Sequence, residues 1–403
     1  MSSTGLAQEV QRPIIQFRPV TWLHKNLFNS WYNTLLTLVV LWILYVSVPA
    51  LLQWLFDANW EPILTSPVLY FVGQYPSAEL WRVGAGVVLV SFSFGLSWGT
   101  WGGPTRTFAM ALMAGYALVA LLPVSLESVG LTGRLFMAAN IPVVMGGFAL
   151  GRTRLGKTRW VLAIGILSFA LIIALLRGAE GIAALPVVQT TRWGGLMLNL
   201  MVAAVGIVAS FPFGILLALG RRSELPVVKV FSTLFIELVR GVPLITILFM
   251  GSLILPLFLP ENIRIDRVLR AMIGITLFSA AYMAENVRGG LQAIPEGQYD
   301  AARAIGLSGP LTTILIILPQ ALRLVIPAIV GQFIALFKDT TLLIIVGINE
   351  ILGIGKSIVL GNPEWVTAHM EVYVFIALLF WVFTYAMSYS SRRLERALGV
   401  GTR

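Results

Sequence analysis

The 403-residue sequence contains no cysteine and only two histidines, His24 and His369. Without cysteine the chain forms no disulfide bonds and no cysteine-ligated metal site. The two histidines are too few, and too far apart in sequence, to indicate a histidine-based metal site. Charged residues are also scarce, at 11% of the chain against about 25% in soluble proteins. We therefore expect no metal site on this chain.

Two functional signatures are absent as well. No G-x-x-x-x-G-K-[ST] pattern occurs, so ATP hydrolysis is not expected on this chain. The first thirty residues lack an apolar stretch followed by an A-x-A cleavage site, so a cleaved signal peptide is not expected. The net charge of +10 does not indicate nucleic-acid binding, because the basic residues lie in short clusters between apolar runs.

Apolar residues dominate the chain, at 58% of the sequence with a mean hydropathy of +0.87. Spans in lipid should be helices, because an open strand edge leaves backbone groups without hydrogen-bond partners. We therefore predict an all-α, polytopic membrane protein with about ten transmembrane helices, each near the ~20 residues that cross the hydrocarbon core. The predicted spans are 33–56, 83–98, 107–123, 135–150, 160–176, 195–219, 228–259, 268–287, 326–348 and 372–389.

The distribution of lysine and arginine predicts the orientation. Most of the 28 basic residues fall in segments that are cytoplasmic if the N-terminus is inside, which places both termini in the cytoplasm. Three arginines, Arg264, Arg267 and Arg270, fall on the outer side against this rule.

The halves of the chain differ in charge. We divide the sequence into a cytoplasmic tail (1–32), an N-terminal extension with about five spans (33–190) and a core (191–403). No charged residue lies inside the first five spans, where Gly95 and Gly99 have the small-xxx-small spacing of close helix pairs. The later spans contain Glu237, Arg240, Glu285, Lys338 and Asp339. A charge inside a span costs about 2.5–3.5 kcal/mol on insertion scales, so the functional residues are expected in the core.

A predicted cytoplasmic loop, 289–319, has a defined spacing: Asp300-Ala301-Ala302, three residues, Gly306, nine residues, then I-I-L-P ending at Pro319. Pro295 is suited to the first helical position, and the small alanines favour a stiff helix with a thin face. Gly306 is expected to cap this helix in the left-handed conformation. Pro310 is expected to open the next helix, which the Leu318–Pro319 step should kink. Without the full spacing, an ordinary helix–turn–helix loop would be the simpler interpretation.

This loop resembles, position for position, the E-A-A, three residues, G, nine residues, I-x-L-P loop of ABC importer permease subunits, with Asp300 where the family usually has Glu. Further segments resemble the polar amino-acid permeases of the histidine/glutamine/arginine class. These are I-E-L-V-R-G-V-P-L at 236–244, A-Y-M-A-E-N-V-R-G-G-L at 281–291, L-P-Q-A-L-R at 318–323 and L-F-K-D-T-T-L at 336–342. The long extension is similar to that of general L-amino-acid permease subunits.

The resemblance implies a type I importer core of five helices in the bacterial inner membrane. It implies two ABC ATPase subunits that bind ATP and magnesium, while this chain binds no cofactor. It also implies a second, distinct permease chain and a periplasmic or lipid-anchored amino-acid-binding protein, within membrane lipid and without nucleic acid. Force from the ATPases would enter through the loop, at Asp300, Ala301, Ala302, Gly306 and Pro319.

The charged residues of the core are candidates for the substrate path or its gate, because a free amino acid presents both an ammonium and a carboxylate. Glu237 and Arg240 share a helix face at i, i+3. Gly241 and Pro243 should break that helix inside the membrane and expose polar backbone. Pairing between helices is an equally simple role for these charges, and the simpler one for Glu285. For Lys338 and Asp339 the path and the structural role remain open.

Two other functions compete with ABC import. An ion-driven secondary transporter would show an inverted repeat with broken helices in both halves, and the uncharged first half argues against that symmetry. A lipid-modifying membrane enzyme would need a cluster of nucleophile, base or metal ligands, and the sequence offers none, so no catalytic residue is expected.

Overall fold

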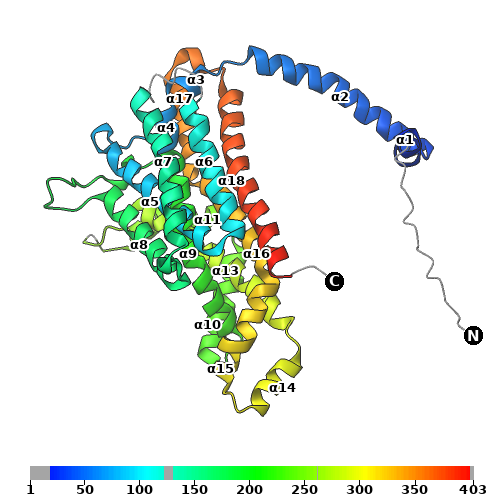
Figure 1. Cartoon of the computed structure of the whole chain (residues 1–403), viewed down its shortest axis with the longest axis vertical. Helices are drawn as coiled ribbons and strands as arrows, with labels where there is room; N and C mark the ends of the chain where they lie inside the picture. Colours follow the sequence, from blue (N-terminus) through cyan, green and yellow to red (C-terminus); the bar gives the residue numbers. More distant parts are fainter. Residues whose placement is uncertain (1–18, 122–129, 261, 400–403) are drawn as a thin grey trace, which may run out of the picture. The chain divides into compact units, whose positions relative to one another are not determined.

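The computed structural model describes residues 19–121, 130–260 and 262–399, and these are almost entirely helical (Figure 1). In the described residues the extended pairing is limited to a single bridge between Gly195 and Glu350. The chain divides into two compact units, one ending at Asn59 and one beginning at Trp60. The predicted all-α fold is therefore confirmed.

The first unit consists of α1 (Pro19–Leu27) and α2 (Trp31–Asp57). Ser30 caps α2, its hydroxyl oxygen accepting a hydrogen bond from the Asn33 backbone N–H at 3.4 Å. The described α2 helix contains no buried residue, as expected for a helix that is apolar all round and solvated by lipid. Residues 1–18 of the predicted tail lie outside the described part.

The second unit begins at Trp60 with the remainder of the extension and continues into the core. The helices of the extension are α3 (Glu61–Thr65), α4 (Pro67–Val72), α5 (Leu80–Trp101), α6 (Gly103–Leu121), α7 (Gly130–Gly151) and α8 (Thr158–Arg177). Those of the core are α9 (Gly195–Arg221), α10 (Pro226–Gly241), α11 (Leu244–Phe249), α12 (Leu255–Phe258), α13 (Arg267–Gln292), α14 (Glu296–Ala304), α15 (Gly309–Thr312), α16 (Leu318–Asp339), α17 (Ile351–Gly361) and α18 (His369–Ala397). Short π or 3₁₀ segments join several of them: η1 (Ser77–Glu79), η2 (Arg154–Gly156), η3 (Thr190–Arg192), η4 (Met250–Ile254), η5 (Thr313–Ile317), η6 (Thr340–Val346) and η7 (Pro363–Trp365).

Within the described ranges, eight helical segments are long and apolar enough to cross a membrane, and the bent pair α10–α11/α12 makes a ninth. The third predicted span corresponds to a shorter apolar helix, Thr105–Leu121, and its predicted end at Pro123 lies outside the described residues. The seventh predicted span, 228–259, is broken as the Gly241 and Pro243 pair suggested, with a bend of 105°. The count of about ten thus holds only if the bent pair and the short helix are both included.

Close backbone contact holds α5 against α7 in the extension. A Cβ added to Gly95 would lie 2.1 Å from the Val144 carbonyl oxygen, and one added to Gly147 would lie 2.4 Å from that of Phe92. A Cβ added to Gly99 would lie 2.3 Å from the Phe148 carbonyl oxygen. The predicted small-residue contact is therefore present, and Gly147 supplies its counterpart on α7.

Several contacts join the part of the extension that follows Asn59 to the core. The α4 helix packs on α9 and α17, and α18 packs against both α6 and α16. Tyr70 of α4 is fully buried among core side chains and meets the ring of Phe375 edge-on. Gly73 and Gly194 approach so closely that a Cβ on Gly73 would lie 2.5 Å from the Gly194 Cα. The part of the extension from Trp60 onward is therefore packed against the core within the second unit.

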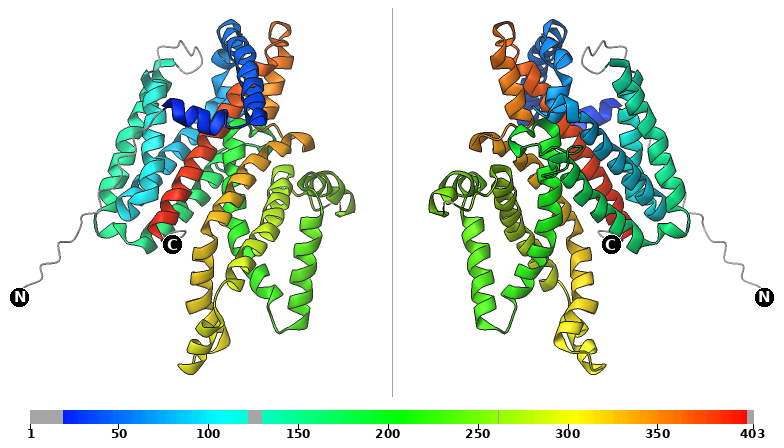
Figure 2. Two further views of the ribbon diagram at one scale, coloured as in Figure 1. Left: turned by 90° about the vertical axis from the view of Figure 1, so that its right-hand side faces the viewer. Right: turned by 90° about the vertical axis from the view of Figure 1, so that its left-hand side faces the viewer.

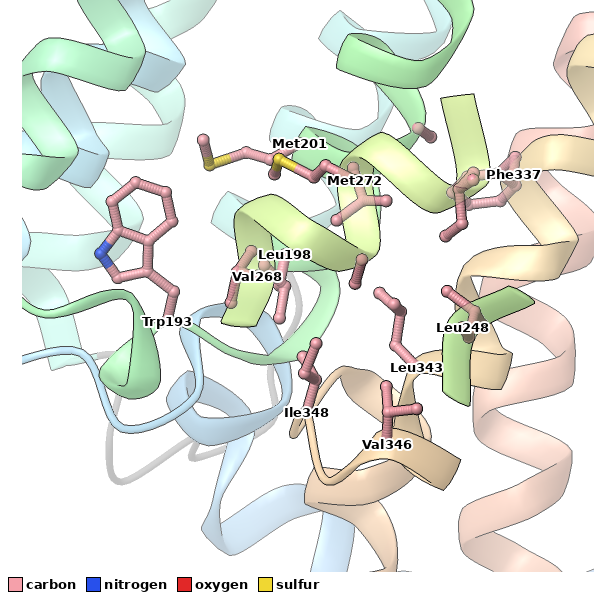
Figure 3. Close-up of a cluster of buried hydrophobic side chains, with 14 of the residues drawn as sticks. Trp193, Leu198, Met201, Leu248, Val268, Met272, Phe337, Leu343, Val346 and Ile348 are labelled. Carbon is pink, nitrogen blue, oxygen red and sulfur yellow. The ribbon is translucent and has the colours of Figure 1, made fainter. Parts of the chain in front are cut away.

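The centre of the core is an apolar cluster around α9, α13 and η6 (Figure 3). It includes Leu198 and Met201 of α9, Val268 and Met272 of α13, and Leu343 of η6. A second cluster joins α9, α10, α13 and α16 near α14. In Figures 1 and 2, α14 and α15 lie at one end of the second unit, and α3, α4 and α17 lie at the other.

Candidate coupling segment and charge network

The predicted loop forms a short helix, α14, held between α13 and α15. Its first residue is Glu296, so Pro295 is the N-cap and not the first helical residue, and the helix begins one position later than predicted. The preceding α13 extends to Gln292, so residues 289–292 of the predicted loop are still helical. These shifts leave the order of the elements as predicted.

Gly306 ends the helix in the left-handed conformation, with φ +81°. The Gly306 N–H donates to the Arg303 carbonyl at 3.0 Å, and the Leu307 N–H donates to the Ala302 carbonyl at 3.1 Å. This pair of bonds is the Schellman arrangement, which satisfies carbonyls that a helix end would otherwise leave free. Pro310 lies in the first turn of α15, as predicted.

The segment before Pro319 departs from α-helical geometry. Residues Thr313–Ile317 form a π-helical turn, and α16 begins at Leu318. Proline lacks an N–H and its ring crowds the preceding turn, which gives this irregularity a local cause.

One side of α14 is tied to the core. Ala302 is buried, whereas Asp300, Ala301 and Gly306 are exposed. The Arg222 guanidinium donates to the Tyr299 hydroxyl at 3.2 Å, and the Gln320 amide donates to Gln298 at 3.2 Å.

The other side of α14 is open. Asp300 and Arg303 form a solvent-exposed pair at 2.5 Å, and Ile305, beside the Gly306 turn, is 74% exposed. Sequence spacing did not identify Ile305 or Arg222. The position of Ile305, directly before the glycine that caps the helix, was the one sequence feature that could have indicated an exposed apolar residue there. The exposed side of α14 thus presents small and apolar atoms, while its opposite side is fixed to the core by the Tyr299 and Gln298 hydrogen bonds.

Three of the five charged residues predicted inside the core spans belong to a network around Glu285 of α13. Its carboxylate lies 2.7 Å from Arg221 of α9, 2.8 Å from Arg288 of α13 and 3.4 Å from Arg240 of α10. Arg221 also reaches Glu237 of α10, at 3.0 Å. The network ties three helices together, and its three arginines outnumber its two carboxylates.

The network shows the pairing between helices that the sequence left open as one role of these charges. Glu237 and Arg240 share a helix face but pair with other helices and not with each other. Arg221, at the end of α9, bridges Glu237 and Glu285. No spacing rule links residues 16 and 64 positions apart, so the sequence offered no signal for it. The inter-helix pairing expected for Glu285 is present.

Lys338 and Asp339 lie elsewhere, at the junction where α16 ends and the 3₁₀ segment η6 begins. Lys338 is exposed and Asp339 is half-buried. Within the described ranges, neither side chain forms an ion pair or hydrogen bond. The structure therefore separates two sets of charges, one paired between helices and one unpaired. Across the described residues no group of acidic or histidine side chains is arranged to hold a metal.

Comparison with known proteins identifies the family. Residues 210–400 match the family described as "Binding-protein-dependent transport system inner membrane component". The chain is 40% identical to the inner membrane amino-acid ABC transporter permease protein YhdY of Escherichia coli K12, over 95% of this chain and 94% of that protein. It is 37% identical to the glutamate/glutamine/aspartate/asparagine transport system permease protein BztC of Rhodobacter capsulatus, over 96% and 95% of the two chains.

Shorter relatives cover about half of the chain. The probable glutamine ABC transporter permease protein GlnP of Bacillus subtilis is 34% identical over 50% of this chain and 91% of its own length. Among solved structures, an amino acid ABC transporter with histidines contains a chain that is 25% identical, with a TM-score of 0.45, covering 50% of this chain and 91% of that one. The protein belongs to the binding-protein-dependent transport family, as an integral-membrane permease of the ABC importer class.

Proposed function

We propose that this permease imports amino acids, of the polar or general L-amino-acid range, and that α14 is its contact with a separate ATPase. The observation that carries the proposal is the α14 segment: a capped helix, anchored through Tyr299 and Ala302, with Ala301 and Ile305 exposed. A rigid helix with a thin exposed face fits a groove on another protein and transmits a push without bending. Relatives named as amino-acid permeases support the substrate class.

The same proposal sets the partners and the sidedness. One chain presents one coupling segment, so a motor with two ATPase subunits requires a second permease chain, which we propose to be a distinct protein. ATP and magnesium bind on the ATPases. The α14 end of the core faces the cytoplasm, both termini lie on that side, and a periplasmic or lipid-anchored binding protein delivers the amino acid from the other side.

We place the substrate path beside Lys338 and Asp339. These charges are unpaired in the described chain, whereas Glu237, Arg240 and Glu285 are neutralised by ion pairs across helices. A zwitterionic amino acid supplies the opposite charge for each, its carboxylate for Lys338 and its ammonium for Asp339. The Gly241–Pro243 break and the 3₁₀ segment η6 provide the irregular backbone that transporters use to line such a path. The ion-paired residues hold the α9, α10 and α13 frame around it.

The first test is purification from the native host in mild detergent, with mass spectrometry of the proteins that co-purify. We expect an ABC ATPase with the wild type and its loss from Gly306→Trp, which places a large side chain at the exposed tip of α14. Gly115→Trp is the matched control, because both glycines have open space around the Cβ position and Gly115 lies on α6. Co-purification with the wild type and both variants would contradict the coupling role of α14.

The second test separates ATP-driven import from ion-gradient transport. Proteoliposomes that contain the complete complex, its binding protein and radiolabelled amino acids should show uptake only with ATP on the α14 side. Uptake driven by a sodium or proton gradient without ATP would overturn the proposal. Lys338→Gln and Asp339→Asn should each reduce uptake strongly while binding of amino acid to the isolated binding protein stays unchanged.

A further inference from the structure

Five basic residues gather at one end of the extension, where α5 ends, α6 begins and α7 turns into α8. Arg152, Arg154 and Lys157 lie in the turn from α7 to α8, Arg159 lies in the first turn of α8, and Arg106 lies near the start of α6. All five residues are exposed. We call them the basic patch.

Contacts between the helix ends hold the basic patch together. The Trp101 indole N–H, at the end of α5, donates to the Thr158 hydroxyl at the start of α8 at 3.2 Å. A Cβ on Gly156 would overlap the Gly151 carbonyl oxygen, so the turn folds back on the end of α7 more closely than a side chain would allow. The α6 helix packs on both α5 and α7. Packing between four helix ends therefore brings these basic residues to one place.

The positive charge of the basic patch is not balanced by acidic side chains in the described part of the chain, where none of its five side chains forms an ion pair. Between Glu79 and Glu180 the sequence contains one acidic residue, Glu127, which belongs to the connection from α6 to α7 and not to this turn. Lys157, at the N-cap of α8, offers no acceptor for the N–H groups of the first turn, so the helix dipole adds to the positive potential.

Three arginines at the α14 end of the core are instead paired with acidic residues. Arg221 and Arg288 meet the Glu285 carboxylate at 2.7 and 2.8 Å, and Arg303 meets Asp300. The orientation rule accounts for basic residues at the inner end of a span, but it does not require that they stay without acidic partners. The contrast indicates that the basic patch takes its counter-charge from another molecule.

The surroundings of the basic patch fit the headgroup level of a membrane. In Figures 1 and 2 the turn from α7 to α8 lies near the level at which α18 ends, whereas α14 extends well beyond it. Trp101 and Trp160 are exposed beside the patch, and indole rings favour the interface between headgroups and hydrocarbon. The Arg159 guanidinium lies over the Trp160 ring, 5.5 Å from its centroid.

The exposed face of α8 continues from the basic patch into the hydrocarbon. Arg159, Leu162 and Ile166 share one face of the helix at i, i+3 and i+7, and both apolar residues are exposed. The α8 helix is long and apolar enough to cross a membrane. An acyl chain that lies along Leu162 and Ile166 therefore leads to Arg159 at the start of the helix.

We propose that the basic patch binds the phosphate groups of anionic phospholipids, whose acyl chains lie along the exposed face of α8. Guanidinium groups bind phosphate in bidentate geometry, and basic residues between the cytoplasmic ends of spans suit anionic headgroups. A membrane is favoured over an acidic protein because exposed tryptophans and aliphatic residues adjoin the patch, and because α14, the proposed ATPase contact, lies at a different level. The site belongs to the extension and does not depend on which solute the core transports.

The test measures lipid binding to the full-length permease in neutral detergent, by native mass spectrometry during titration with phosphatidylglycerol. The wild type should bind phosphatidylglycerol in preference to phosphatidylcholine, which is zwitterionic. Arg154→Gln/Arg159→Gln should weaken the phosphatidylglycerol affinity about tenfold to thirtyfold, because each basic residue near an anionic surface contributes about fivefold. Higher salt should weaken the wild-type affinity as well.

Two further variants separate the basic patch from net charge and from folding. Lys229→Gln/Arg303→Gln removes two exposed basic residues at the α14 end of the core and should bind phosphatidylglycerol as the wild type does. Arg154→Lys/Arg159→Lys keeps both charges, and its affinity should stay within about threefold of the wild type, since lysine also binds phosphate.

Four results would each overturn the lipid site. Equal wild-type affinity for phosphatidylglycerol and phosphatidylcholine would show that the headgroup charge is not recognised. Equal weakening by the two double glutamine variants would show that net charge, and not the basic patch, attracts the lipid. Unchanged phosphatidylglycerol affinity in Arg154→Gln/Arg159→Gln, together with loss of a co-purifying protein, would assign the patch to a protein partner. If that variant does not fold, the salt response of the wild type decides, and an affinity that salt leaves unchanged refutes the site.

Discussion

The Glu285 carboxylate on α13 lies 2.7 Å from the Arg221 guanidinium at the end of α9. The side chain of Glu285 is 16% exposed and that of Arg221 is 27% exposed, so water screens the pair only partly. The same carboxylate also meets Arg240 and Arg288. Glu285 is therefore the residue whose loss leaves the most positive charge uncompensated in this part of the core.

Glu285→Gln is expected to destabilise the permease by about 2–4 kcal/mol, because removing one partner leaves charged groups without compensation in a partly buried site. The measurement is unfolding in a mixed-micelle denaturant titration. Asp300→Asn removes a carboxylate from the exposed Asp300–Arg303 pair and should change stability by less than about 1 kcal/mol. Equal effects of the two substitutions would contradict the central role of Glu285.

Arg240→Gln is expected to abolish ATP-driven uptake while expression in the membrane remains intact. Arg240 contacts Glu285 at 3.4 Å, lies over the Tyr282 ring and directly precedes Gly241, where α10 ends. Removing its charge should disturb the bend between α10 and α11. Lys229→Gln, on the exposed face of the same helix, is the control. Normal uptake by Arg240→Gln would exclude a role for Arg240 in the path or its gate.

Gly306→Val is expected to uncouple ATP hydrolysis from uptake. The residue has φ +81°, and a left-handed conformation costs an L side chain about 1–2 kcal/mol. Because the surroundings are open, the cost comes from the backbone and not from a clash. Gly306→Asn should retain more activity than Val, since asparagine tolerates this conformation better. Gly309→Ala is the control. Uptake by Gly306→Val at the level of Gly309→Ala would refute the requirement for a left-handed residue at position 306.

Gly95→Ala is expected to destabilise the extension by about 1–3 kcal/mol, because its Cβ would lie 2.1 Å from the Val144 carbonyl and force α5 and α7 apart. Thermal unfolding in detergent, monitored by loss of monodispersity, measures the effect. Gly146→Ala places the same methyl group where no atom of the described chain lies within 4 Å, so it should be neutral. A similar melting temperature for both variants would contradict the tight α5–α7 contact.

Much of the fold was predictable because lipid imposes simple rules on sequence. Long apolar runs indicated the helices, and the Gly241 and Pro243 pair indicated the break that the structure bends by 105°. The count of spans was less accurate, because hydropathy registers apolar length and does not distinguish a straight span from a bent pair or a short helix. The Gly306 cap was also predictable, since it depends only on local backbone preference.

The sequence by itself determined the helices, the broken span, the capped helix α14 and the resemblance to ABC importer permeases. Each of these depends on residues within a few turns of one another. Only the tertiary structure decided that Arg221 joins Glu237 to Glu285. It also decided that Lys338 and Asp339 stay unpaired within the described chain. Those relationships join helices far apart in the chain, and a charge in a sequence can pair with any opposite charge until packing brings one of them within reach.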